Sequence, residues 1–282
     1  MDVLAVEIVE DRTTASRCDL GFLTLRRLVV RNRYTDGSSS APYPCDVLRR
    51  PGSDAVVAVL YRIREGRVEV LLREALRVPI YLRRSETFVH PDPREYNSII
   101  EVVAGMVERG DAPGPAGLRR RAAVEALEEA GCAVPEAAFA VLGGETFASP
   151  GTGDEKIFFC AAETELEARS AADGDGSVME EWGRLHVMEL GEALDACRSG
   201  AIPDMKTEVA LLRLADHIGW IPALGAFLDD LPEEVRALRR APRALPTALP
   251  TGAAPQPEPR PPGGHARGDQ APGGPSSGPP LP

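Results

Sequence analysis

Three glutamates near the end of one predicted helix are the residues of this sequence best suited to chemistry. Glu125, Glu128 and Glu129 stand at offsets of zero, three and four, so a helix brings them onto one face, about 6 Å apart between Cβ atoms. They fall in the last two turns, where the helix dipole disfavours carboxylates. A divalent cation such as Mg²⁺, which prefers oxygen ligands and bridges carboxylates to phosphates, would offset that cost. A solvated acidic surface is the alternative that the spacing leaves open.

The elements that must position these acids follow from the hydrophobic pattern. A helix is predicted over residues 118–130, a run of helix formers without Gly or Pro that ends at Gly131. Residues 55–63 and 68–72 form a hairpin pattern around the turn at 64–67. Further strands are predicted at 20–34, 98–103, 138–142, 156–162 and 185–188, and further helices at 191–199 and 207–219. Strands and helices that interleave without a strict βαβ rhythm predict an α+β fold with a mixed sheet.

The stretch from Glu101 to Cys132 resembles the Nudix box, G-x5-E-x7-R-E-U-x-E-E-x-G-U, in which U is aliphatic. Gly105 matches the first glycine, and Asp111 stands where the first glutamate is expected. Residues 125–132, EALEEAGC, match the second half of the pattern, with small residues at both U positions.

Motifs outside the box resemble one branch of that superfamily, the ADP-ribose and nucleoside-diphosphate-sugar pyrophosphatases. Residues 101–105, EVVAG, resemble the E-x-x-A-G entry of this branch. Arg77 stands where the branch has the arginine of a Q-F-R-like segment. Ser149-Pro150-Gly151 with Glu155 resembles its S-P-G-x-x-x-E turn, and residues 204–207, DMKT, resemble its D-x-K-T motif. The resemblance covers about residues 20–219.

The sequence departs from the pattern at three places. Val124 replaces the box arginine. Twelve residues separate Asp111 from Val124 where the pattern has seven. Gly183 stands where relatives often carry a further metal carboxylate. Arg121 and Arg120, three and four residues before Val124, project from the same side of the helix, and one of them could supply the missing guanidinium as structural support. Arg121 is also four residues before Glu125. Exposed arginines without this role are the alternative.

The resemblance implies a Mg²⁺ site, with Mn²⁺ as a possible substitute. Its ligands would be Glu125, Glu129 and the carbonyl of Ala104, and Glu128 would support them in catalysis. A carboxylate in the loop before the last strand often takes the proton of the attacking water in this branch, and Glu181 is the best-aligned residue. A solvated loop acid is its alternative interpretation.

The resemblance also implies the substrate contacts. Arg77 and Lys206 would contact the phosphates or the sugar, and Gly105 and Glu155 belong to the same substrate-binding set. Each of the two cations could equally be an ordinary surface residue.

Together these features imply a Nudix fold, an α/β/α sandwich with a mixed β-sheet and a small N-terminal β element. The implied reaction is Mg²⁺-dependent hydrolysis of the pyrophosphate bond in a nucleoside diphosphate sugar, with ADP-ribose as the leading case, to a nucleoside monophosphate and a sugar phosphate. A catalytically degenerate Nudix domain that acts as a nucleotide-sugar-binding or regulatory module is the alternative. Val124, the five-residue insertion and Gly183 favour it, whereas the intact box glutamates argue against it. The base and the sugar cannot be read from the sequence.

Composition limits the partners and the compartment. The chain has 282 residues, 32 Lys and Arg against 43 Asp and Glu, and a net charge of −11. Such acidity disfavours binding to nucleic acids or anionic membranes. No apolar run reaches the ~20 residues that span a bilayer, and the N-terminus shows no signal-peptide pattern. Five cysteines without a C-x-x-C pair fit free thiols in the cytoplasm.

The chain is expected to divide into four parts. Residues 1–50 form an N-terminal β region that could dimerise, since related enzymes exchange such strands across a homodimer. Residues 51–222 form the hydrolase domain, and 223–240 a C-terminal extension. Residues 241–282 contain 13 prolines and 7 glycines, and we expect this tail to be disordered.

Overall fold

The computed structural model describes residues 21–34, 36–50, 52, 54–167 and 183–237. The chain divides into two compact units, Met1–Arg236 and Ala237–Pro282. The predicted tail, residues 241–282, lies outside the described residues. The predicted catalytic base, Glu181, also lies outside them.

A long hairpin forms the centre of the main sheet, where the sequence predicts one. Strands β3 (Ala55–Arg64) and β4 (Arg67–Ala75) pair antiparallel, and their turn uses the positive φ angles of Glu65 and Gly66. Only the ends near this turn pair with each other, over Leu60–Arg64 and Arg67–Leu71. The two strands then separate, and this gap is filled by two short strands that position the site.

The filling strands are β5 (Ile99–Glu101), which pairs with β4, and β6 (Val103–Met106), which pairs with β3. The sequence predicts a single strand over 98–103 here. The strand is interrupted at Val102 because the Val102 N–H donates to the side-chain oxygen of Thr207, at 2.9 Å, instead of to a neighbouring strand.

The complete sheet is mixed, as predicted. Its remaining strands are β7 (Ala140–Val141), β8 (Thr146–Phe147), β9 (Lys156–Glu163) and β10 (Gly183–Glu189). The strand order is β10-β4-β3-β9-β7, with β3 and β9 parallel and the other pairs antiparallel.

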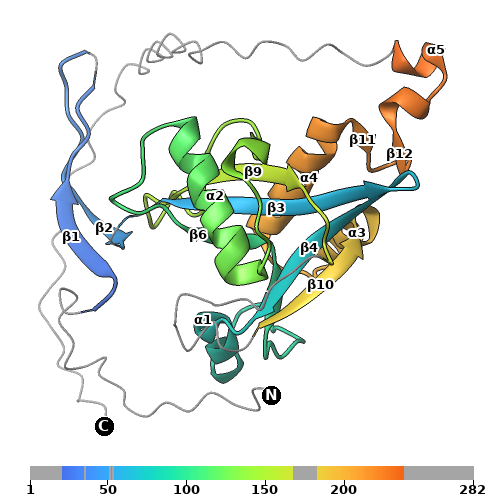
Figure 1. Cartoon of the computed structure of the whole chain (residues 1–282). Helices are drawn as coiled ribbons and strands as arrows, with labels where there is room; N and C mark the ends of the chain where they lie inside the picture. The colour runs from blue at the N-terminus through green and yellow to red at the C-terminus, as the bar shows by residue number, and fades with distance from the viewer. Residues whose placement is uncertain (1–20, 35, 51, 53, 168–182, 238–282) are drawn as a thin grey trace, which may run out of the picture. The chain divides into compact units, whose positions relative to one another are not determined.

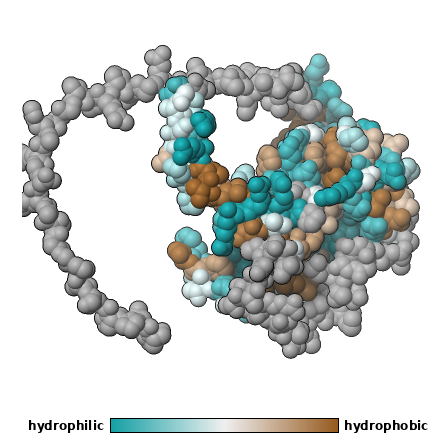
Figure 2. Space-filling model, turned by 90° about the vertical axis from the view of Figure 1, so that its left-hand side faces the viewer, coloured by the Kyte–Doolittle hydropathy of each residue, from teal (hydrophilic) through white to brown (hydrophobic). Residues whose placement is uncertain are grey.

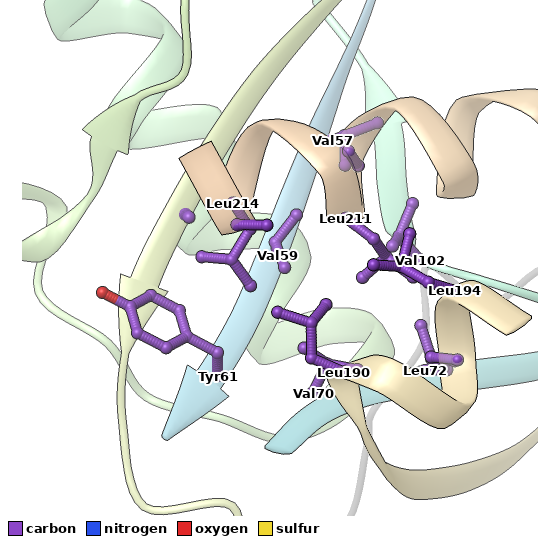
Figure 3. Close-up of a cluster of buried hydrophobic side chains, with 14 of the residues drawn as sticks. Val57, Val59, Tyr61, Val70, Leu72, Val102, Leu190, Leu194, Leu211 and Leu214 are labelled. Atoms are coloured by element: carbon purple, nitrogen blue, oxygen red, sulfur yellow. The ribbon is translucent and has the colours of Figure 1, made fainter. Parts of the chain in front are cut away.

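Helices cover both faces of this sheet (Figure 1). Alternate residues of β3 point to opposite faces. Val56, Ala58 and Leu60 pack with α2 (Pro115–Ala130), whereas Val57 and Val59 pack with α3 (Leu190–Arg198) and α4 (Met205–Ile218). Figure 3 shows the second core, in which leucines of α3 and α4 lie over valines of β3 and β4. The predicted helices are confirmed.

A separate two-stranded sheet precedes the main sheet. Strand β1 (Thr24–Val30) pairs antiparallel with β2 (Tyr43–Arg49). The sequence analysis predicts strand structure only for the first of these. The hairpin contacts the turn before β9, where the Leu48 N–H donates to the Thr152 carbonyl at 2.8 Å. Its surface is hydrophilic toward its own turn and hydrophobic farther along the strands (Figure 2).

Short elements complete the described chain. After β4 come α1 (Val78–Tyr81) and the 3-10 helix η1 (Leu82–Ser85), which the sequence analysis does not predict. The others are η2 (Glu136–Ala138), β11 (Trp220–Ile221), β12 (Ala226–Phe227), η3 (Leu228–Asp230) and α5 (Glu233–Arg236).

Two sequence expectations concern the environment of the chain. Among the described residues, no helix is both long and apolar enough to cross a bilayer. The four described cysteines, Cys45, Cys132, Cys160 and Cys197, are free thiols. Burial raises the pKa of the Cys160 thiol to about 11, so this side chain is an unreactive core residue.

We expect Thr207→Val to destabilise the fold. The Thr207 side chain is fully buried, and its hydroxyl accepts from the Val102 N–H and donates to Asp204 at 2.6 Å. Valine has the same shape but leaves both groups without this partner, which should lower the free energy of unfolding by about 1–3 kcal/mol. Urea unfolding measures the change, with Thr146→Val on the partly exposed strand β8 as the control. A loss below ~0.5 kcal/mol would contradict this account of the break between β5 and β6.

Candidate active site

Helix α2 places two of the predicted metal ligands against strand β6. Glu125 and Glu129 are one turn apart and 8% and 7% exposed. The Ala104 N–H donates to Oε2 of Glu129 at 3.1 Å. A Cβ added to Gly105 would lie 1.9 Å from the carboxylate carbon of Glu125, so only glycine lets the strand approach this closely. The structure therefore brings Ala104, Gly105, Glu125 and Glu129 together.

Arg73 on β4 is a buried cation beside this pair. Its side chain is 5% exposed, and its Nη1 donates to Oε1 of Glu129. Both carboxylate oxygens of Glu129 therefore accept a hydrogen bond, one from Arg73 and one from the Ala104 N–H. A guanidinium and a backbone donor therefore compensate the burial of this carboxylate.

Arg121, in the middle of α2, joins this helix to the loop that precedes it. Its guanidinium donates to both carboxylate oxygens of Asp111, at 2.9 and 3.0 Å, and its Nη1 lies 3.1 Å from Glu108 and 3.7 Å from Oε1 of Glu125. The hydrogen bonds from Arg121 hold the pKa of Asp111 below its usual range, against the opposing effect of burial. Arg121 thus contacts both Asp111, at the first-glutamate position, and Glu125, and its supporting role stays a prediction.

A second charged cluster gathers two of the predicted substrate contacts. Glu101, 3% exposed, accepts from Nε of Arg77 at 2.6 Å and also pairs with Nζ of Lys206. Lys206 further donates to Asp204 at 2.9 Å, and Asp204 caps the N-terminus of α4. Glu101 lies directly opposite Arg73 in the β4–β5 register, so the two clusters are neighbours on one face.

Glu155 lies in a third place. Its carboxylate pairs with Arg50 in a cleft between the N-terminal hairpin and the turn at residues 149–153. Its polar neighbours there include Arg49, Ser149 and Asp154. The structure brings this predicted substrate contact into the hairpin cleft rather than into either glutamate cluster.

The remaining predicted positions are less enclosed. Glu128 is partly exposed on α2. Val124 lines an outer groove of the same helix together with Leu127 and Arg120, and Arg120 approaches Glu136 only at 4.0 Å. Of the two arginines considered as replacements for the box arginine, Arg121 is therefore the one that approaches a box glutamate, since its Nη1 lies 3.7 Å from Oε1 of Glu125. Glu181 lies outside the described residues.

The sequence analysis missed the roles of Arg73 and Glu101. Arg73 interrupts the apolar strand pattern VEVLLREA on the face that Leu71 shares, which is the side of α2. A charged residue at an inward position of a buried strand is a signal that could have found it. The sequence analysis treats Glu101 only as part of the E-x-x-A-G motif. A single acid between Ile100 and Val102 is likewise a charged residue within an apolar strand, which indicates a buried and partnered side chain.

The donor atoms fit a hard divalent cation only in part. Two buried carboxylates and a backbone carbonyl are the oxygen ligands that Mg²⁺ accepts. Within the described parts of the chain, however, no group of three or more His, Cys, Asp or Glu side chains is arranged to hold a metal ion. Arginines contact both glutamates, so cationic groups of the protein already stand beside the expected ligands.

Comparison with known proteins gives distant relatives of one kind. No family model matches the chain. An ADP-ribose pyrophosphatase of Haemophilus influenzae is 26% identical over 197 residues, which are 70% of this chain and 80% of the relative. ADP-ribose pyrophosphatases of Escherichia coli K12 and Shigella flexneri are each 28% identical over 201 residues, 70% of this chain and 83% of each relative. These similarities suggest a Nudix-type family and a hydrolase acting on pyrophosphate bonds.

We expect Arg121→Ala to destabilise the fold in a pH-dependent way. The change leaves Asp111 and Glu125 buried without this guanidinium, which should lower the free energy of unfolding by about 3–5 kcal/mol at pH 7. The pKa of Asp111 is lower in the folded than in the unfolded state. Its stabilising contribution is therefore complete above the unfolded pKa near ~4 and is lost as the pH falls through the folded pKa.

The deficit of the Arg121→Ala protein should accordingly shrink below about pH 4. Urea unfolding at pH 7 and in the acidic range measures it. Arg120→Ala is the matched control, because this exposed neighbour should change stability by less than about 1 kcal/mol. Equal effects of the two substitutions, or a deficit that does not change with pH, would contradict the role of Arg121.

Proposed function

We propose that this protein hydrolyses the pyrophosphate bond of a nucleoside diphosphate sugar, with ADP-ribose as the leading substrate and a nucleoside monophosphate and a sugar phosphate as products. The observation that carries the proposal is the buried pair Glu125 and Glu129, packed against Ala104 and Gly105. These residues fall on a Nudix-like motif, and the relatives named ADP-ribose pyrophosphatase support the same reaction.

The reaction adds water to one phosphorus, breaks its bond to the bridging oxygen and leaves the electron pair on the departing phosphate. In the proposal, Glu125, Glu129 and the Ala104 carbonyl hold Mg²⁺, or Mn²⁺ in its place. The bound cation would supply neutralisation of the phosphate charge and a lowered pKa of bound water. Glu128 supports the ligands, and Glu181 accepts the proton of the attacking water.

The substrate-binding proposal involves the second cluster and the hairpin cleft. Arg77 and Lys206 contact the phosphates or the sugar, and Glu101 orients both cations toward one place. Arg77 remains 38% exposed, so its guanidinium has surface left for a ligand. Gly105 allows the backbone to approach the substrate, and Glu155 contributes from the cleft.

A second function is favoured by a specific observation. Because Arg73 and Arg121 contact Glu129 and Glu125, the site is partly neutralised without a metal. A Nudix-like domain that binds a nucleotide sugar and does not hydrolyse it would also fit this arrangement. Turnover decides between the two functions.

Glu129→Gln is expected to lower the turnover of ADP-ribose by at least about 100-fold, since the amide removes a charged metal ligand. Circular dichroism checks that the variant is folded, because buried Arg73 loses a carboxylate partner. Purified protein with Mg²⁺ is assayed on ADP-ribose, ADP-glucose, UDP-glucose and GDP-mannose, and phosphate is measured after phosphatase treatment. The matched control is Glu136→Gln, an exposed glutamate just after the same helix.

Two outcomes would reject parts of this proposal. If Glu129→Gln hydrolyses at the native rate, the metal-site assignment is wrong. If the native protein hydrolyses no substrate of the panel yet binds ADP-ribose, the binding function replaces hydrolysis.

We also propose that the protein forms a homodimer through the β1–β2 hairpin, in a reducing compartment such as the cytoplasm, which the free thiols support. A two-stranded sheet is marginally stable alone. This hairpin exposes apolar side chains, with Val29 77% and Phe22 60% exposed. Residues 21–34 carry four arginines and no acid, whereas the whole chain carries a net charge of −11. A second copy therefore complements the hairpin in both apolar surface and charge.

We expect Val29→Glu to convert a dimer into a monomer, because it places a carboxylate in the apolar contact. Light scattering after gel filtration measures the mass. Val89→Glu is the control, since Val89 is 95% exposed on a loop outside the hairpin. A native protein with the mass of one chain would rule out the dimer.

A further inference from the structure

Arg73 is a buried cation whose place in the fold has a consequence for metal binding. It lies on the face of β4 that turns toward α2, next to Leu71, which packs in the core beneath that helix. Its guanidinium donates to Oε1 of Glu129, and both side chains are about nineteen-twentieths buried, 5% and 6% exposed. In such surroundings a charge pair is weakly screened by solvent.

Strand β10 leaves room for this guanidinium. Gly183 pairs with Ala75 in the β10–β4 register, two residues from Arg73. A Cβ added to Gly183 would lie 3.2 Å from Nε and 3.7 Å from Nη2 of Arg73. A side chain at position 183 would therefore crowd the guanidinium. Gly183, which stands where relatives often carry a metal carboxylate, is thus adjacent to the Arg73 guanidinium that contacts Glu129.

The consequence for a metal ion follows from charge. Oε2 of Glu129 already accepts the Ala104 N–H, and Oε1 accepts from Arg73. A divalent cation that binds the same carboxylate would stand close to the guanidinium, and two like charges in a buried site repel strongly. Either the guanidinium leaves Glu129 or the metal binds weakly.

We propose that Arg73 is a built-in counter-cation of Glu129, which competes with a divalent cation and keeps the free protein's affinity for metal low. The inference rests on the proposed role of Glu125 and Glu129 as metal ligands. Arg73 is a positioning residue here, since it acts through Glu129. By linkage the competition is reciprocal. The free energy by which the Arg73–Glu129 contact weakens metal binding equals the free energy by which bound metal weakens that contact.

The test measures metal affinity with Mn²⁺ alone, by titration calorimetry and by the electron paramagnetic resonance signal of free Mn²⁺. We expect Arg73→Gln to bind Mn²⁺ about 10- to 100-fold more tightly than the native protein, the usual range of coupling between two sites. Arg73→Lys, which keeps the positive charge, should retain weak binding. Arg62→Gln is the matched control, because Arg62 is also a largely buried strand arginine, 11% exposed, paired with Glu69 and Glu167 instead.

Two further variants locate the effect. In the Arg73→Gln protein, adding Glu129→Gln should abolish the gain in Mn²⁺ affinity, which assigns the gain to this carboxylate. Circular dichroism follows folding. If Arg73→Gln folds only when Mn²⁺ is added, the metal has replaced the missing cation and the proposal is supported.

Three results would overturn the proposal. The first is an unchanged Mn²⁺ affinity in Arg73→Gln, the second a gain that persists without Glu129, and the third a protein that folds neither with nor without Mn²⁺. Metal affinity and hydrolysis are measured separately. A tighter Mn²⁺ site in a protein that hydrolyses none of the nucleotide sugars would leave this inference standing and reject only the proposed reaction.

Discussion

Burying a carboxylate is costly unless a cation and hydrogen-bond donors accompany it, and this requirement organises the centre of the molecule. In the part of the chain that the structure describes, three glutamates are buried, Glu101, Glu125 and Glu129. Three arginines and a lysine contact them, from β4, from the residue before α1, from α2 and from α4. These ion pairs therefore fix the positions of the elements relative to one another. They lie where β3 and β4 separate and where β5 and β6 pair with them.

Local patterns predicted much of this frame. The β3–β4 hairpin follows from two apolar runs around Glu65 and Gly66, and the end of α2 follows from Gly131, which adopts the left-handed conformation with φ 65°. Periodicity also indicated that Glu125 and Glu129 share a helix face, and both are buried there. Such features depend on residues close together in the chain, so the sequence alone can carry them.

Contacts between distant segments could not be predicted in the same way. Arg73 and Glu129 are 56 residues apart, and Glu101 and Lys206 are 105 apart. Whether Arg77 and Lys206 face solvent or a buried carboxylate depends on how β5 meets α4, which no local pattern encodes. The interruption between β5 and β6 has the same origin, because the competing acceptor is on Thr207. The metal and substrate roles of the site residues stay predictions.

The bidentate contact between Arg121 and Asp111 has a consequence for how the chain can vary in length. This contact joins the loop before α2 to the helix through side chains. The position of α2 against β6 is therefore set by the Arg121–Asp111 contact and by the close approach at Gly105. Between Asp111 and Arg121 only residues 112–114 precede the helix, because α2 begins at Pro115. A flexible loop loses only about 0.6 kcal/mol of closure entropy for each doubling of its length. Residues inserted at 112–114 can therefore change the outer surface while leaving the carboxylates in place.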